Sequence, residues 1–212
     1  MRNAMRTIGK VYFLLFAMVA PALAQNLQSA PSPAVAGPAF DLSAGYSHVS
    51  MPIPSAGHAT FNGLDFSGNI GLSPRWGATL DSNYLYTPDI LDTHHQGYVL
   101  SLHTGPVFYP IERGNTRVFV RALAGMGLVD GAVPITDVRN YHGWLVRPSY
   151  VFGAGIEHAV SSQLALRFNG DYLHTSFYDS VGEVQPQDSL RLTVSFVFRL
   201  KQHPRRSSAQ LW

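Results

Sequence analysis

Hydrophobic and polar residues alternate with a period of two along most of the chain, from Phe40 to Leu200. In the segment 76–86, tryptophan, alanine, leucine and tyrosine occupy even positions, whereas glycine, threonine, aspartate and asparagine occupy odd positions. Successive side chains of a β-strand point to opposite faces, so this pattern predicts strands with one apolar and one polar face. Gly or Pro interrupts any window in which a helix could be sought, and the expected fold class is therefore all-β.

Eight segments carry this alternation, and each has about the ten residues that a tilted strand needs to span a bilayer. They are Phe40–Val49, Asn62–Leu72, Trp76–Tyr86, Gly97–Phe108, Arg117–Gly127, Tyr150–Ala159, Leu164–His174 and Ser189–Leu200. The connections between them alternate between short polar ones and mostly longer ones, which is typical of outer-membrane barrels. We therefore expect a closed, eight-stranded, antiparallel, up-and-down transmembrane β-barrel. Both termini should lie at the short-turn end, in the periplasm.

The charged residues that we assign within strands fall on the polar face. They are Asp41, Asp65, Asp81, Arg121, Glu157, Arg167, Asp171, Arg191 and Arg199. Arg or Lys on the lipid face at mid-bilayer costs about 2–4 kcal/mol, so the polar face should point into the lumen. An eight-stranded barrel is just wide enough for side chains to fill. We expect paired charges to plug the lumen; the alternative is a low-conductance pore, gated by a rearranging Arg–carboxylate pair.

Aromatic residues distinguish this barrel from a soluble one, which would alternate in the same way but bury its apolar face. Near the longer loops the apolar face carries Tyr46, Tyr84, Tyr86, Tyr98, Tyr150 and Tyr172, and near the short turns it carries Trp76, Phe108 and Phe198. Two aromatic girdles, one at each interface, are typical of membrane barrels. Outer-membrane lipids are therefore the expected partner of this face.

Residues 1–24 have the pattern of a bacterial signal peptide. Three basic residues precede an apolar run from Val11 to Ala20, and Ala22-Leu23-Ala24 provides a small-x-small cleavage site. Without this leader the chain holds 12 Lys and Arg against 13 Asp and Glu, so its basic isoelectric point does not indicate a nucleic-acid partner. Residues 25–38 are rich in Ala and Pro and form an expected flexible lead-in to a barrel over 39–200. Residues 201–212 form an expected basic periplasmic tail.

Two features resemble known outer-membrane proteins. The segment Thr193-Val-Ser-Phe-Val-Phe-Arg-Leu200 resembles the signal that the barrel assembly machinery reads, although Ser195 replaces a glycine and twelve residues follow. The strand rhythm, Gly-Ala-Gly-Ile-Glu at 153–157 and Asp171-Tyr172 resemble the eight-stranded outer-membrane β-barrel domain family, which includes the transmembrane domain of outer membrane protein A. The resemblance implies an outer-membrane location, a structural or surface-interaction role, and contact with the assembly machinery through Thr193 to Leu200.

An enzymatic alternative rests on His174-Thr175-Ser176 together with Glu183. This arrangement resembles the His-x-Ser and Glu of outer-membrane lipid A deacylases, in which a histidine base oriented by a carboxylate activates a serine. By alternation His174 and Ser176 should face lipid at the outer rim. Asp179 competes with Glu183 for the role of the acid, and no oxyanion-hole motif is recognisable. The main interpretation therefore contains no catalytic residues.

Other kinds of site find little support in the sequence. The chain contains no cysteine, which excludes disulfides, thiolate zinc sites and a thiol nucleophile. We expect no metal and no cofactor. The longest predicted loop, Leu128–Ser149, carries apolar residues such as Ile135 and Trp144. These either form an adhesive surface or fold back over the rim, and the sequence identifies no partner for them.

Overall fold

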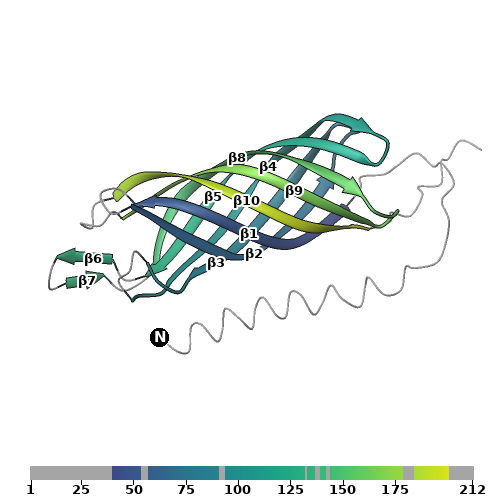
Figure 1. Cartoon of the computed structure of the whole chain (residues 1–212). Helices are drawn as coiled ribbons and strands as arrows, with labels where there is room; N and C mark the ends of the chain where they lie inside the picture. The colour runs from purple at the N-terminus through teal and green to yellow at the C-terminus, as the bar shows by residue number, and fades with distance from the viewer. Residues whose placement is uncertain are drawn as a thin grey trace, which may run out of the picture. The chain divides into compact units, whose positions relative to one another are not determined.

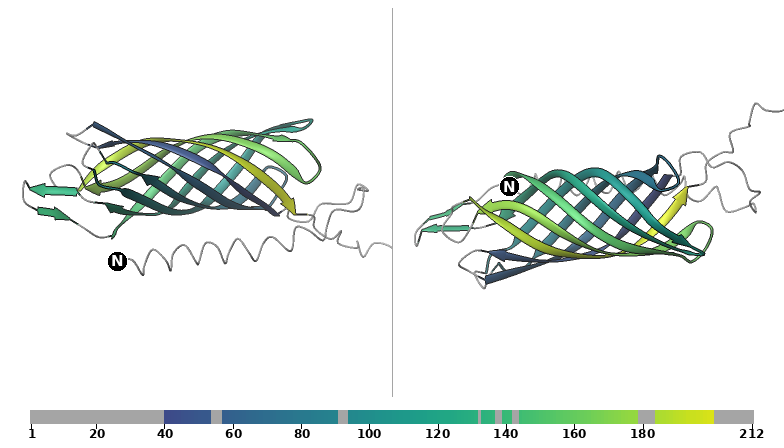
Figure 2. Two further views of the ribbon diagram at one scale, coloured as in Figure 1. Left: turned by 60° about the horizontal axis from the view of Figure 1, so that its bottom comes forward. Right: turned by 90° about the horizontal axis from the view of Figure 1, so that it is seen from above.

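Eight long strands form one closed antiparallel barrel (Figures 1 and 2). The computed structural model describes residues 40–53, 57–90, 94–131, 133–136, 139–141, 144–178 and 184–200. The barrel strands are β1 (Phe40–Ile53), β2 (Gly57–Gly71), β3 (Trp76–Thr87), β4 (Gly97–Arg113), β5 (Thr116–Gly131), β8 (Trp144–Ala159), β9 (Leu164–Tyr178) and β10 (Val184–Leu200). Within the connection from β5 to β8, the strands β6 (Val133–Thr136) and β7 (Arg139–Tyr141) form a separate hairpin.

The strand order confirms the predicted up-and-down topology. Around the barrel it runs β1-β10-β9-β8-β5-β4-β3-β2, so each strand pairs with its neighbours in the chain and β1 closes against β10. Closure leaves no unpaired edge. The start of β1 and the end of β10 lie at the end of the barrel that carries the short turns, called the short-turn end here; the opposite end is the long-loop end.

Three predicted segments lie outside the described residues. They are the signal peptide 1–24, the lead-in 25–38 and the basic tail 201–212. Within the part of the chain that is described, no helix is long and apolar enough to cross a membrane.

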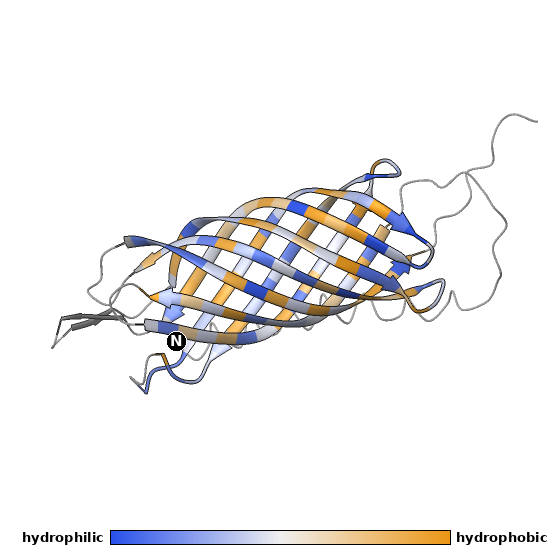
Figure 3. Cartoon of the chain, turned by 45° about the horizontal axis from the view of Figure 1, so that its top comes forward, coloured by the Kyte–Doolittle hydropathy of each residue, from blue (hydrophilic) through white to orange (hydrophobic). Residues whose placement is uncertain are grey.

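The distribution of polarity in the barrel wall is the reverse of that in a soluble protein. Hydrophobic and hydrophilic residues alternate along each strand (Figure 3). Leu80, which points outward from β3, is 53% exposed, whereas the next residue, Asp81, is fully buried in the lumen. Leu64 and Phe168 are likewise exposed, while Arg191 is buried. The described wall thus has apolar side chains outside and polar side chains inside.

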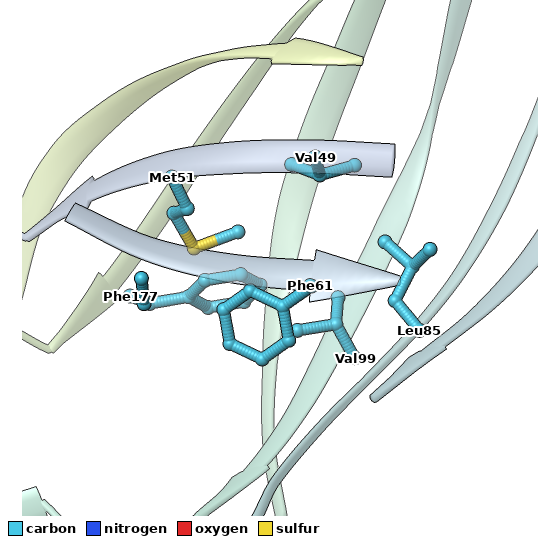
Figure 4. Close-up of a cluster of buried hydrophobic side chains, with 7 residues drawn as sticks. Val49, Met51, Phe61, Leu85, Val99 and Phe177 are labelled. Carbon is cyan, nitrogen blue, oxygen red and sulfur yellow. The ribbon is translucent and has the colours of Figure 1, made fainter. Parts of the chain in front are cut away.

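At the long-loop end the polarity of the two faces of the wall is reversed. In β1 the inward residues shift from Asp41 to Val49 and Met51, while the outward residues shift from Leu42 to Ser50. Figure 4 shows the resulting apolar cluster inside the barrel, where side chains from several strands point toward one another. We call this set the apolar layer; its fully buried members are Val49, Met51, Ala59, Phe61, Leu85, Val99 and Phe177. The sequence analysis did not predict it.

Part of the apolar layer lies where the strands are longer than predicted. β1 continues to Ile53 and β2 begins at Gly57, where the predicted strands end at Val49 and begin at Asn62. β8 and β10 also begin earlier than predicted, at Trp144 and Val184. Beyond the bilayer a barrel wall meets water, so apolar side chains there turn inward as in a soluble protein.

The connection between β4 and β5 is shorter than predicted. We expected it to run from Tyr109 to Thr116, but β4 continues to Arg113 past an irregularity between Phe108 and Ile111. The turn itself places Gly114 at a φ of 59°. This left-handed backbone conformation strains residues with a side chain and suits glycine. The tight turn therefore keeps the short-turn end compact.

Glycine also permits close approach between strands in the wall. A Cβ atom on Gly125 would lie 1.9 Å from the carbonyl oxygen of Leu102 in the neighbouring strand. A Cβ atom on Gly63 would likewise lie 1.9 Å from the carbonyl oxygen of Tyr84. Glycine within a strand commonly marks a bend or such a close approach of backbones.

We therefore expect Gly125→Ala to destabilise the refolded barrel by about 1–3 kcal/mol, the usual range for overpacking. The measurement is the free energy of unfolding in urea, with the protein in detergent micelles. Gly170→Ala is the matched control, because its Cβ would meet nothing closer than Leu192 Cδ2 at 3.6 Å. Equal stability of the two variants would contradict the proposed contact.

Candidate functional site

All nine charged residues predicted on the polar face lie in the barrel wall and connect through the lumen. Their hydrogen bonds and ion pairs divide them into two clusters. The middle cluster contains Asp65, Asp81, Arg121, Asp171 and Arg191; the short-turn cluster contains Asp41, Glu157, Arg167 and Arg199, joined by Arg117. Alternation brings these side chains inward, and strand register decides which of them meet.

In the middle cluster, Arg121 and Arg191 bridge the same two carboxylates. Arg121 donates to Asp171 Oδ1 and Oδ2 at 2.9 and 2.7 Å, and to Asp81 Oδ2 at 3.0 Å. Arg191 donates to Asp81 Oδ1 at 3.0 Å and to Asp171 Oδ2 at 2.9 Å. Its Nη1 also lies 3.9 Å from Asp65 Oδ2. Charge-assisted, forked contacts of this kind are the strongest that arginine makes.

In the short-turn cluster, Glu157 is the common acceptor. Its Oε2 accepts from Arg167 at 3.0 Å and its Oε1 accepts from Arg199 at 2.8 Å. Arg117 also donates to Glu157, and its Nη2 lies 3.2 Å from Asp41 Oδ2. One fully buried carboxylate therefore holds three arginines that come from three different strands.

The middle cluster and the short-turn cluster together form what we call the inner network. Two further ionisable members, Arg117 and His103, were not predicted from the sequence. Arg117 lies four residues before Arg121 in β5. This even spacing puts both side chains on the same face of the strand and could have placed Arg117 in the lumen. His103 donates or accepts through Nε2 at 2.9 Å from Ser149 Oγ, and its Nδ1 lies 3.9 Å from Asp81. His103 likewise occupies an inward position in the alternation of β4, so the sequence pattern could have placed it in the lumen.

The inner network and the apolar layer fill the lumen at different levels. The charges are buried and paired, which offsets most of the cost of removing them from water. Above them, toward the long-loop end, the apolar layer lies beside buried polar side chains such as Thr87 and Gln187. Within the described ranges, no group of three His, Cys, Asp or Glu side chains could hold a metal ion. The described lumen thus holds buried ion pairs along most of its length and an apolar cluster at the long-loop end.

The aromatic residues of the two predicted girdles lie on the outer face of the wall. Tyr46, Trp76, Tyr150 and Tyr172 are about half exposed, and Tyr84, Tyr86, Tyr98, Phe108 and Phe198 are partly buried. Neighbouring rings lie close together across strands in tilted orientations. The ring centroids of Trp76 and Phe108 lie 4.7 Å apart, and those of Tyr86 and Tyr98 lie 5.1 Å apart.

The structure gives His174 a different acidic partner from the one predicted. Glu183 lies outside the described residues, whereas Asp188 pairs with His174 across β9 and β10, with 2.6 Å between Nδ1 and Oδ1. Ser176 lies two residues further along β9 on the same outward face and is partly buried. Asp188 lies beyond the apolar outer face of β10, which begins at Leu190. Hydrogen bonds from Tyr172 and His174 lower the pKa of its carboxyl.

Comparisons with solved structures identify the fold. Neisserial surface protein A superposes with a TM-score of 0.59 at 14% sequence identity, covering 78% of this chain and all of that one. The attachment invasion locus protein Ail of Yersinia pestis gives 0.55 at 13% identity, with 78% and 100% covered. OprG of Pseudomonas aeruginosa gives 0.52 at 10% identity, with 78% and 97% covered. No protein-family model and no curated protein sequence matches the chain.

The chain thus has the fold of the eight-stranded outer-membrane β-barrels, as the sequence analysis predicted. At these identities the likeness concerns the fold alone. What the barrel does must be argued from its own side chains.

Removal of Arg191 provides a test of the inner network. We expect Arg191→Met to lower the free energy of unfolding by about 3–5 kcal/mol, because it leaves Asp81 and Asp171 with an uncompensated buried charge. Urea unfolding of the refolded barrel measures the effect. The control is Arg75→Met in an exposed turn, where a change within about 0.5 kcal/mol is expected. Similar small changes in both variants would show that the network does not hold the lumen together.

Proposed function

We propose that the chain is an integral protein of the bacterial outer membrane, with a closed lumen and a structural or surface-interaction role. The observation that carries this proposal is the paired charge network buried inside a wall whose outer face is apolar. Such a wall suits lipid on the outside. The aromatic residues at its two ends would lie at the membrane interfaces, and both termini would lie in the periplasm.

Surface interaction is the part of this proposal that concerns the long-loop end. Long extracellular loops and short periplasmic turns are the usual arrangement in these barrels, which would place the connection that holds β6 and β7 outside the cell. Two proteins of the same fold are, by name, a surface protein and an attachment protein. We also propose that the barrel assembly machinery binds the segment Thr193 to Leu200 of the closing strand β10.

We expect the folded barrel to form no discrete channels in planar lipid bilayers. The apolar layer, which includes Phe61 and Phe177, and the ion pairs beneath it would oppose the passage of ions. Heat-unfolded protein in the same detergent is the control for leaks caused by the preparation. Reproducible small current steps from the folded protein alone would instead support the alternative of a low-conductance pore.

An ester hydrolase is a second candidate function, favoured by the contact between His174 and Asp188. A carboxylate on Nδ1 would orient the ring and leave Nε2 as a base, and the outward Ser176 would be the nucleophile. Catalysis would require the serine hydroxyl to lie within hydrogen-bond reach of Nε2. A site of this kind, just beyond the apolar outer face, would suit an acyl ester at the membrane interface, such as lipid A.

This candidate predicts release of fatty acid from lipid A by the folded protein in mixed micelles. Ser176→Ala and Asp188→Asn should each lower the rate by at least about a hundredfold, as removal of members of such a triad does. Ser50→Ala, an outward serine at the same end of β1, is the matched control. A parent protein without activity would end the proposal.

A further inference from the structure

A cavity of about 370 Å³ opens at the short-turn end of the barrel. The turns between β4 and β5 and between β8 and β9 form its edge, and the end of β10 forms one side. Its polar lining consists of Arg117, Arg199, Asn115, Ser161, Ser162 and Glu112. The cavity is therefore continuous with the short-turn cluster of the inner network, and two arginines of that cluster line it.

Positive charge is in excess at this end of the lumen. The short-turn cluster contains three arginines but only two carboxylates, Asp41 and Glu157. The middle cluster has the opposite imbalance, with three carboxylates and two arginines. Deeper in the barrel, Asp81 and Asp171 already accept from Arg121 and Arg191, and Asp65 accepts from Asn83. The excess positive charge therefore lies next to the cavity, and the excess negative charge lies farther inside.

Arg199 is held in place at the wall of the cavity. Its Nη2 donates to Glu157 at 2.8 Å, and its side chain remains 27% exposed. Arg117 lies beside it, held by Glu157 and stacked over the ring of Tyr109 at 4.7 Å. The two guanidinium groups are thus fixed in place before any ligand arrives.

We propose that this cavity binds a small oxyanion, a phosphate or carboxylate group, between Arg199 and Arg117. Guanidinium groups suit such oxygens because their donors form a planar fork. Asn115, Ser161 and Ser162 supply further neutral donors at the edge. The bound anion balances the excess charge of the short-turn cluster. Because Glu112 also lines the cavity, a singly charged group binds better than a divalent one such as sulfate.

Calorimetric titration of the full mature protein, folded in a detergent without phosphate, tests this proposal. The probes are inorganic phosphate, acetate and sulfate. A second arm uses water-soluble dihexanoyl phosphatidic acid, which carries the same phosphate chemistry on a lipid. We expect saturable binding of one anion per barrel. Binding of the lipid but not of free phosphate would assign the ligand to a membrane headgroup; the absence of binding by every probe would overturn the proposal.

Two variants connect the binding to the cavity. Arg199→Gln should weaken binding by at least about tenfold, the effect of losing one charge-assisted hydrogen bond, and it leaves Glu157 with two arginines. Asn115→Asp places a negative charge at the edge without touching the ion pairs, and should weaken binding similarly even if Arg199→Gln does not fold. Arg75→Gln, in an exposed turn outside the cavity lining, is the control. Equal affinity of all these proteins would contradict the assigned site.

Discussion

The pairing of Arg121 and Arg191 with Asp81 and Asp171 is the interaction on which the rest of the structure depends. These four groups are almost completely buried, and an unpaired charge in such a place would cost several kcal/mol. Their side chains come from β3, β5, β9 and β10, on different sides of the barrel. The wall must therefore close in one register for all of them to be satisfied. The register that closes the barrel is thus also the register that pairs these charges.

The change of polarity along the strands gives the barrel two parts. Through most of its length the wall is apolar outside and polar inside, which suits lipid. At the long-loop end the apolar layer around Phe61 and Phe177 lies inside, and polar residues such as Thr60 face outward. The strands thus have the polarity of a membrane barrel along most of their length and that of a soluble barrel at the long-loop end. The tyrosines Tyr46 and Tyr172 lie just before the change, where an interface is expected.

Alternation in the sequence was sufficient to predict the fold class and all eight barrel strands, and it assigned the nine charges to one face of those strands. It could not predict which charges meet. Arg191 and Asp81 come from strands that are not neighbours, so their contact depends on the strand register and on closure of the barrel. The apolar layer escaped prediction because Val49 and Met51 reverse the pattern that defines the strands. Asp188 was missed as the partner of His174, since the two meet only once β9 and β10 are aligned.

Lipid contact of the outer face is the central claim, and site-directed spin labelling tests it most directly. The chain has no cysteine, so single labels can be placed by Leu80→Cys, Phe152→Cys and Thr60→Cys in a barrel reconstituted into bilayers. The account predicts that dissolved oxygen relaxes the labels at positions 80 and 152, and that a water-soluble nickel chelate relaxes the label at position 60. Relaxation of the first two labels by the nickel chelate would contradict it.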